Sequence, residues 1–243
     1  MDSVASALAA ARGGAHRVEL CSSLPEGGVT PSAGMIAAVR GAVSIDIQVM
    51  VRPRGSDFCY SEDECAVMRR DVLMARQLGA NGVVFGILDL NGSVDVRRTA
   101  ELAQLAAPMA VTFHRAFDCS RDLFVSLAEL QEAGVARVLT SGGRKTAAEG
   151  AETIARLVTA ASGRIVVMAG GGIRSHNVGS LIERTGVREI HSGLRSVVPS
   201  SMRYRNEEVS LGTGCVREDE HYTVDEREVR SLLEAAGNRA RQR

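Results

Sequence analysis

The chain has 243 residues, with 29 Lys and Arg against 29 Asp and Glu. This length suits one large domain, because α/β barrels of this size fold as a single unit. A net charge of zero is not typical of nucleic-acid-binding proteins, which carry a basic excess or patch, and no apolar stretch approaches the ~20 residues that a membrane helix needs.

The chain is expected to open with a helix, capped by Asp2 or Ser3 and with Val4, Leu8 and Ala11 on one face. This N-terminus lacks the basic region and apolar run of a secretory signal. Its serine and alanine content leaves an organelle transit peptide open as an alternative.

Short β-branched segments then alternate with longer segments of helical period. The expected strands lie at 17–21, 45–53, 83–88, 109–114, 137–141, 165–169 and 189–192. The expected helices lie at 32–42, 62–78, 94–106, 121–133, 146–162 and 175–186, with a last helix near 225–237. Strands that alternate with helices indicate βαβ units and a parallel sheet.

Two parallel folds compete, the TIM (β/α)₈ barrel and the doubly wound sheet. A dinucleotide-binding sheet needs a GxGxxG motif directly after its first strand, and none occurs there. We therefore predict an α/β fold of the TIM-barrel type, one domain over 1–243, with 199–243 as a C-terminal loop and last helix. Because a helix comes first and only seven strands are expected, the barrel is expected to lack its first strand, unless something else closes the gap. The sheet edges left unpaired would invite association, so one hypothesis is a non-catalytic, oligomeric interaction protein.

Candidate acids and bases lie at the ends of the expected strands, where barrels of this type carry function. They are Glu19, His114 and His191, and histidine is suited to proton transfer near neutral pH. An enzyme acting on a small phosphorylated or carboxylated substrate is therefore one hypothesis. A polar layer that fills the barrel would use the same residues, so this alternative stays open.

A small anionic ligand is a second candidate at this face. Arginines can clamp a carboxylate or phosphate bidentately, and glycines before a helix N-terminus let backbone N–H groups approach an anion. The candidate residues are Arg52, Arg54, Gly170, Gly171, Gly172, Ser192, Arg203 and Arg205. A tight turn at the glycines and a surface loop at the last two arginines are the alternatives.

The five cysteines show no paired spacing, which favours a reduced, intracellular protein. Cys21, Cys59 and Cys119 fall at or just beyond strand ends, whereas Cys65 lies on a helix and Cys215 in the tail. Soft thiolates select Cu(I) or zinc. Free cysteine is more often a small buried apolar residue, so both interpretations stay open.

Several segments together resemble the copper homeostasis protein CutC family. They are 17–21, 26–32, 52–58, 111–118, 138–142, 169–173 and 202–206, and the resemblance runs from about residue 2 to 214. Each motif is weak alone, but the ordered set is specific.

This resemblance implies a TIM barrel, a cytoplasmic homo-oligomer with the nucleus as a further compartment, and Cu(I) binding by cysteine at the C-terminal face of the barrel. It assigns no established reaction. The matching ligand in this chain is Cys21. Family members have a strand with a second cysteine before the position of Asp2, and this chain begins after it. A Cu(I) ion on Cys21 would therefore need Cys59, Cys119, Met50 or a second chain as a further soft ligand.

Overall fold

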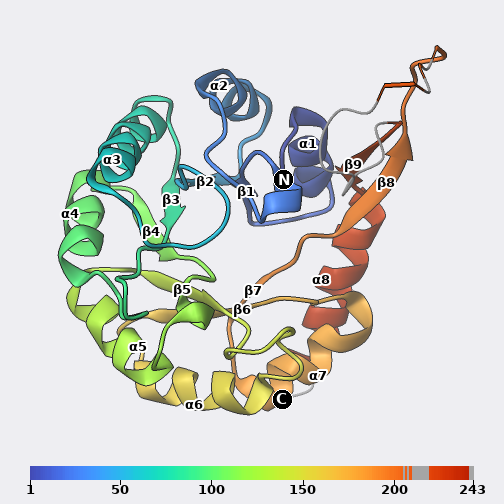
Figure 1. Cartoon of the computed structure of the whole chain (residues 1–243). Coiled ribbons are helices and arrows are strands. Elements are labelled where there is room, and N and C mark those ends of the chain that lie inside the picture. Colours follow the sequence, from blue (N-terminus) through green and yellow to red (C-terminus); the bar gives the residue numbers. More distant parts are fainter. Residues whose placement is uncertain (205, 207, 210–218, 241–243) are drawn as a thin grey trace.

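Seven parallel strands form one sheet, and their order in the sheet is their order in the chain (Figure 1). The computed structural model describes residues 1–204, 206, 208–209 and 219–240. The strands are β1 (Arg17–Leu20), β2 (Asp46–Met50), β3 (Gly82–Phe85), β4 (Ala110–Phe113), β5 (Arg137–Thr140), β6 (Val166–Gly170) and β7 (Glu189–His191). Each expected strand is confirmed, with small shifts at its ends.

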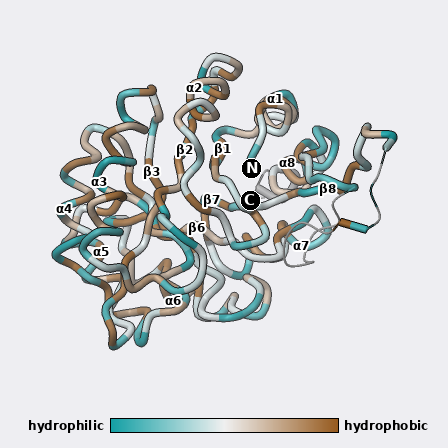
Figure 2. Tube along the Cα trace, turned by 45° about the horizontal axis from the view of Figure 1, so that its top comes forward, coloured by the Kyte–Doolittle hydropathy of each residue, from teal (hydrophilic) through white to brown (hydrophobic). Residues whose placement is uncertain are grey.

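Helices surround this sheet on its outer side (Figure 1). They are α1 (Val4–Arg12), α2 (Ala33–Ala42), α3 (Glu62–Gln77), α4 (Val96–Ala106), α5 (Leu123–Glu132), α6 (Ala151–Ala161), α7 (Ser175–Thr185) and α8 (Glu226–Ala240). The Ser3 side chain caps α1, as expected, by accepting from the N–H of Ser6 at 3.2 Å. Hydrophilic and hydrophobic residues alternate along these helices, as expected when one face of each packs on the sheet (Figure 2).

Successive side chains of a strand point to opposite faces of the sheet, one toward the helices and the other toward the interior of the curved sheet. In β1, Val18 and Leu20 are buried in the main core between the sheet and the helices. Arg17 and Glu19 point to the other side, into the interior of the curved sheet, and line a cavity there. The interior is therefore polar where it meets this strand.

The sheet is an open form of the TIM barrel. A complete barrel of this type has eight strands, whereas β1 and β7 are the end strands of a seven-stranded sheet here. In the described part of the chain, neither end strand pairs with a further strand on its outer side. The predicted fold, a TIM barrel lacking one strand, is confirmed.

The C-terminal region differs from the expected loop and helix. Strands β8 (Arg195–Pro199) and β9 (Glu220–Val224) pair antiparallel as a two-stranded ribbon that projects beyond the barrel (Figure 1). The last helix is present as α8. Two short 3₁₀ helices, η1 (Leu24–Glu26) and η2 (Phe117–Cys119), follow β1 and β4. None of the described helices combines the length and the apolar composition that a membrane-spanning helix requires.

Candidate functional site

Cys21 follows β1 directly and is buried, with 2% of the residue exposed. It forms a small apolar cluster with Met50 and Val84, against which Leu24 packs, apart from the main core. A methyl group added at Gly28 would lie 3.2 Å from Cys21 Sγ and 3.7 Å from Met50 Cε. The thiol and the end of this methionine side chain therefore meet at Gly28.

Met1 lies on the other side of this cysteine. Its carbonyl oxygen accepts from the backbone N–H of Cys21 at 2.9 Å and from the thiol at 3.6 Å, and its amino group lies 3.8 Å from Sγ. Burial raises the pKa of the Cys21 thiol, and the positive charge at Met1 opposes this rise without cancelling it. The thiol is therefore protonated near neutral pH.

Arg52 holds the loop that brings Gly28 against the cysteine. Its guanidinium donates to the carbonyl oxygens of Glu26 (2.8 Å), Gly28 (3.0 Å) and Ser56 (2.7 Å), and it stacks over the Phe58 ring at 5.0 Å. The two terminal nitrogens are thus used within the protein, whereas the buried Nε has no hydrogen-bond partner among the described residues. The structure thus gives Arg52 a positioning role for the loop between β1 and α2.

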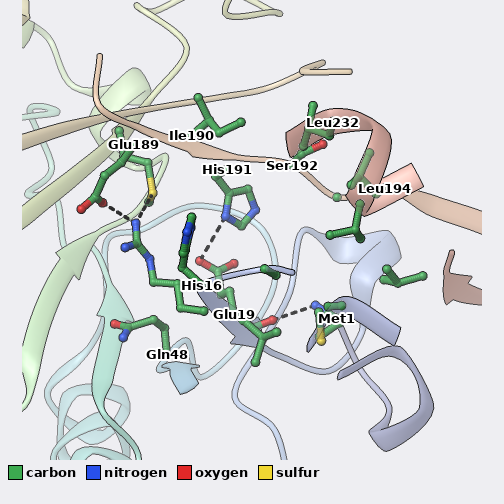
Figure 3. A pocket seen from close by; sticks show the side chains of 18 of the residues that line it. Met1, His16, Glu19, Gln48, Glu189, Ile190, His191, Ser192, Leu194 and Leu232 are labelled. Carbon is green, nitrogen blue, oxygen red and sulfur yellow. Dashed lines mark hydrogen bonds and ion pairs between the residues drawn. The ribbon is translucent and has the colours of Figure 1, made fainter. Parts of the chain in front are cut away.

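A cavity of about 840 Å³ lies between β1 and β7 (Figure 3). Two pairs of side chains span it on the inner side. His191 Nδ1 of β7 lies 4.0 Å from a carboxylate oxygen of Glu19 of β1. Arg17 donates to the carboxylate of Glu189, which also accepts from Arg137 Nε at 2.7 Å.

The Glu189 carboxylate is ionised in this arrangement. Burial opposes its ionisation, but the hydrogen bonds from Arg17 and Arg137 outweigh burial and lower its pKa below the ordinary value. The two expected acid–base candidates Glu19 and His191 are thus brought together, beside a carboxylate whose charge is already compensated.

His114, the third candidate, is buried away from that pair. Its Nδ1 accepts from the N–H of Ala116 at 3.1 Å, so the proton of the neutral ring is on Nε2. Nε2 is buried, with no hydrogen-bond partner among the described residues. Burial, assisted by the positive charge of Arg52, lowers the pKa of His114 to about 3, so the ring is neutral at pH 7.

Arg54 and Cys59 lie in the loop after β2, and Cys119 lies in η2 after β4. Arg54 pairs with Glu64 at 2.5 Å and with Asp57 at 3.0 Å. Cys59 is partly buried and Cys119 is exposed. In the described ranges, no group of three or more His, Cys, Asp or Glu side chains could hold a metal ion, so Cys59 and Cys119 do not form such a group with Cys21.

The triple glycine lies at the C-terminal end of β6, as predicted: Gly170 is the last residue of the strand, and Gly171 and Gly172 follow with φ angles of +103° and +71°. This is the region that favours glycine. Ser192 Oγ donates to the carbonyl of Ile173 at 2.7 Å, which ties the end of β7 to the glycine turn. Arg203 is exposed in the segment after β8, and Arg205 and Cys215 lie outside the described residues.

Asp118 is the polar residue at this face that sequence reasoning missed. Its carboxylate accepts from Thr140 Oγ1 (2.5 Å), from the backbone N–H groups of Ser141 and Gly143 (3.0 Å each), and from Arg115 Nε (2.8 Å). Only 6% of the side chain is exposed. It joins the loops after β4 and β5. In the sequence, only its position at the end of the 111–118 motif could have pointed to this residue.

Comparison with known proteins assigns the chain to a family. The family model described as the CutC family matches residues 1–196. The chain belongs to the CutC family. A Chromobacterium violaceum CutC family protein is 47% identical over 233 residues, which are 96% of this chain and 94% of that protein. A human copper homeostasis protein cutC homolog is 45% identical over 239 residues, 98% of this chain and 88% of that protein.

A solved CutC structure agrees with this assignment. The putative copper homeostasis protein CutC from Streptococcus agalactiae is 35% identical, with a TM-score of 0.70 over 72% of this chain and 87% of that chain. The resemblance stated from the motifs is confirmed. The structure places Cys21 in one apolar cluster with Met50, and the carbonyl oxygen of Met1 lies 3.6 Å from the Cys21 sulfur.

Proposed function

We propose that this CutC-family protein binds Cu(I) through the thiolate of Cys21. The observation that supports this most strongly is the pairing of a buried thiol with a methionine in an apolar cluster at the C-terminal end of β1. Thiolate and thioether are the soft ligands that Cu(I) prefers. Met50 is accordingly the second ligand in this proposal.

Binding requires the thiol to lose its proton, because the thiolate is the metal ligand. Burial raises the pKa of Cys21, so the proton is present at pH 7 and is released when copper binds. The apparent affinity should therefore rise with pH, about tenfold per unit below the thiol pKa, as for one released proton. Arg52 contributes by holding Gly28 against both sulfur-bearing side chains.

The test is a Cu(I) titration against a chelator under reducing conditions. Cys21→Ser should lose the tight site, and Met50→Leu, which replaces the thioether by an apolar side chain of similar size, should weaken it. Cys65→Ser is the matched control, because Cys65 is also a buried free cysteine but lies in the main core on α3. Unchanged affinity in Cys21→Ser would refute the proposal.

The compartment and the assembly are part of the same proposal. Cys21 must stay reduced to hold Cu(I), which suits the cytoplasm. We expect a homo-oligomer, which light scattering after gel filtration would show. A monodisperse monomer would count against that part alone.

An enzymatic function on a small anionic substrate is the second candidate. It is favoured by one observation, the 4.0 Å approach of Glu19 and His191 inside the cavity. A carboxylate beside an imidazole can move a proton on a bound substrate. Thermal-shift screening with phosphosugars and carboxylates tests it, and Glu19→Gln should abolish turnover of any hit. The absence of stabilisation by all the anions would contradict this function.

A further inference from the structure

We propose that a small carboxylate binds at the C-terminal ends of β2 and β4, between the guanidinium of Arg52 and the imidazole of His114. Arg52 lies two residues beyond β2, and His114 directly follows β4. Neither residue lines the cavity that holds Glu19 and His191, so the site is a separate one and depends on neither function proposed above.

Each of these two residues has a buried nitrogen that lacks a partner. Arg52 and His114 are both 5% exposed. Among the described residues, Arg52 Nε and His114 Nε2 have no hydrogen-bond partner. Buried polar groups are normally hydrogen-bonded, and one that is left unpaired destabilises the fold. Two such groups close together therefore indicate a site for a ligand.

The two side chains approach one another across the end of β3. A Cβ added at Gly86, just after β3, would lie 2.6 Å from His114 Nδ1 and 2.7 Å from its Cε1. The imidazole therefore lies over Gly86, which has no side chain to block it. The centroid of the Phe58 ring lies 4.9 Å from that of His114 and 5.0 Å from Arg52 Cζ. Both side chains thus border one aromatic ring.

Both unpaired nitrogens are hydrogen-bond donors. His114 Nδ1 accepts from the N–H of Ala116 at 3.1 Å, and burial keeps the ring neutral at pH 7, so the proton is on Nε2. Every nitrogen of a guanidinium carries hydrogen, so Arg52 Nε is a donor as well. The site therefore lacks an acceptor, which a ligand would supply.

Arg52 also carries a positive charge without a counter-charge. Its guanidinium forms no ion pair among the described residues. Its acceptors are the backbone carbonyls of Glu26, Gly28 and Ser56, and the Phe58 ring adds a cation–π contact. None of these groups is an anion, whereas buried charges in proteins are normally paired. A bound anion would supply both the counter-charge and the acceptor.

The charge of the site matches a monoanion. Arg52 supplies one positive charge, and His114 is neutral. The Tyr60 hydroxyl is buried and unpaired as well, and it is un-ionised: burial raises the pKa of Tyr60 to about 12, against the lowering effect of the charge on Arg52. A carboxylate has one negative charge and two oxygens that accept hydrogen bonds, whereas a phosphate dianion would leave a charge uncompensated.

Phe58 is the cover of this site. It is partly exposed, whereas Arg52, His114 and Tyr60 are buried. Because the ring contacts both Arg52 and His114, a ligand from solvent would reach the two donors by displacing it.

The experiment uses the full chain, labelled with ¹⁵N, and sodium formate as the probe. Formate should shift the Nε2–H signal of His114 and the amide signal of Ala116 in a saturable way, while Nδ1 stays unprotonated. The expected Kd is about 1–10 mM, because formate has few atoms with which to bind. Formamide has a similar shape but no charge and should cause no shift. Sodium chloride at the same concentrations is the control for ionic strength.

A first pair of variants tests the donor. His114→Asn keeps an acceptor for the N–H of Ala116 but removes the Nε2 donor. It should weaken formate binding, followed at the Ala116 amide, at least about tenfold, as expected for one hydrogen bond to a charged group. His16→Asn, at an exposed histidine, should leave the binding unchanged.

A second pair tests the cover. Phe58→Leu removes the ring that competes for the charge of Arg52, so formate should bind about two- to fivefold more tightly. Phe124→Leu is the matched control, because Phe124 also contacts a guanidinium, that of Arg156 at 4.9 Å, but Arg156 is exposed. This pair decides the location even where His114→Asn does not fold.

Three results would overturn the proposal. They are the absence of a saturable shift up to about 100 mM formate, at least tenfold above the expected Kd, equal binding by folded His114→Asn, and equal binding by Phe58→Leu. A shift that chloride causes to the same extent would assign the site to a halide and overturn the carboxylate assignment. Cys21→Ser should still bind formate, so this test is separate from the copper test.

Discussion

His114 should make the stability of the protein depend on pH in a way that one substitution can remove. The ring is buried, and its pKa is lowered from 6.5 to about 3. In the unfolded chain the ring is solvated and takes up a proton near pH 6.5. As the pH falls, the unfolded state is therefore protonated first, and the free energy of unfolding decreases.

The magnitude follows from the two pKa values. Between pH 8 and pH 5 the unfolded chain gains the proton and the folded chain does not, which costs about 2 kcal/mol of unfolding free energy. The loss begins as the pH falls through the unfolded pKa and ends near pH 3, where the folded ring is protonated as well. Above pH 7.5 the site should contribute no pH dependence.

Urea unfolding of the wild type and of His114→Asn at several pH values measures this difference. Asparagine does not titrate, and its side-chain oxygen can still accept from the N–H of Ala116, as Nδ1 does now. The gap between the two free-energy curves should close by about 2 kcal/mol from pH 8 to pH 5. His16→Asn, at an exposed histidine, is the control. Parallel curves for the wild type and His114→Asn would refute the reasoning.

Three further substitutions should each lower the free energy of unfolding, which thermal and urea unfolding measure. Gly82→Ala should cost about 1–3 kcal/mol, because its Cβ would lie 2.0 Å from Gln48 Oε1, whereas Gly41→Ala has no atom within 4 Å and should not destabilise. Asp118→Asn should cost about 1–3 kcal/mol, because an amide cannot accept all the hydrogen bonds that the carboxylate receives. An unchanged urea midpoint would show that these bonds do not stabilise the fold. Glu189→Gln should destabilise by a similar amount, because two arginines lose their counter-charge, and added salt should narrow the difference from the wild type.

The repeating part of the fold could be predicted because its signals are local. Each strand of the sheet is a short β-branched segment, and glycines such as Gly79 and Gly134, with φ angles of +81° and +77°, mark where a helix ends before the next strand. The β8–β9 ribbon was not predicted. Its two strands are separated by residues 200–219, so no short turn motif links them, and β8 contains arginine and proline rather than a clear alternating pattern.

For the candidate site, the sequence could predict which residues lie at the ends of strands but not which residues they contact. Cys21, Glu19 and His191 were placed correctly at the C-terminal side of the sheet because parallel strands all end at one face. Their partners depend on how the loops close. That Arg52 donates to backbone carbonyls, and that Asp118 joins two loops, are contacts between segments distant in the chain. No spacing in the sequence encodes such contacts.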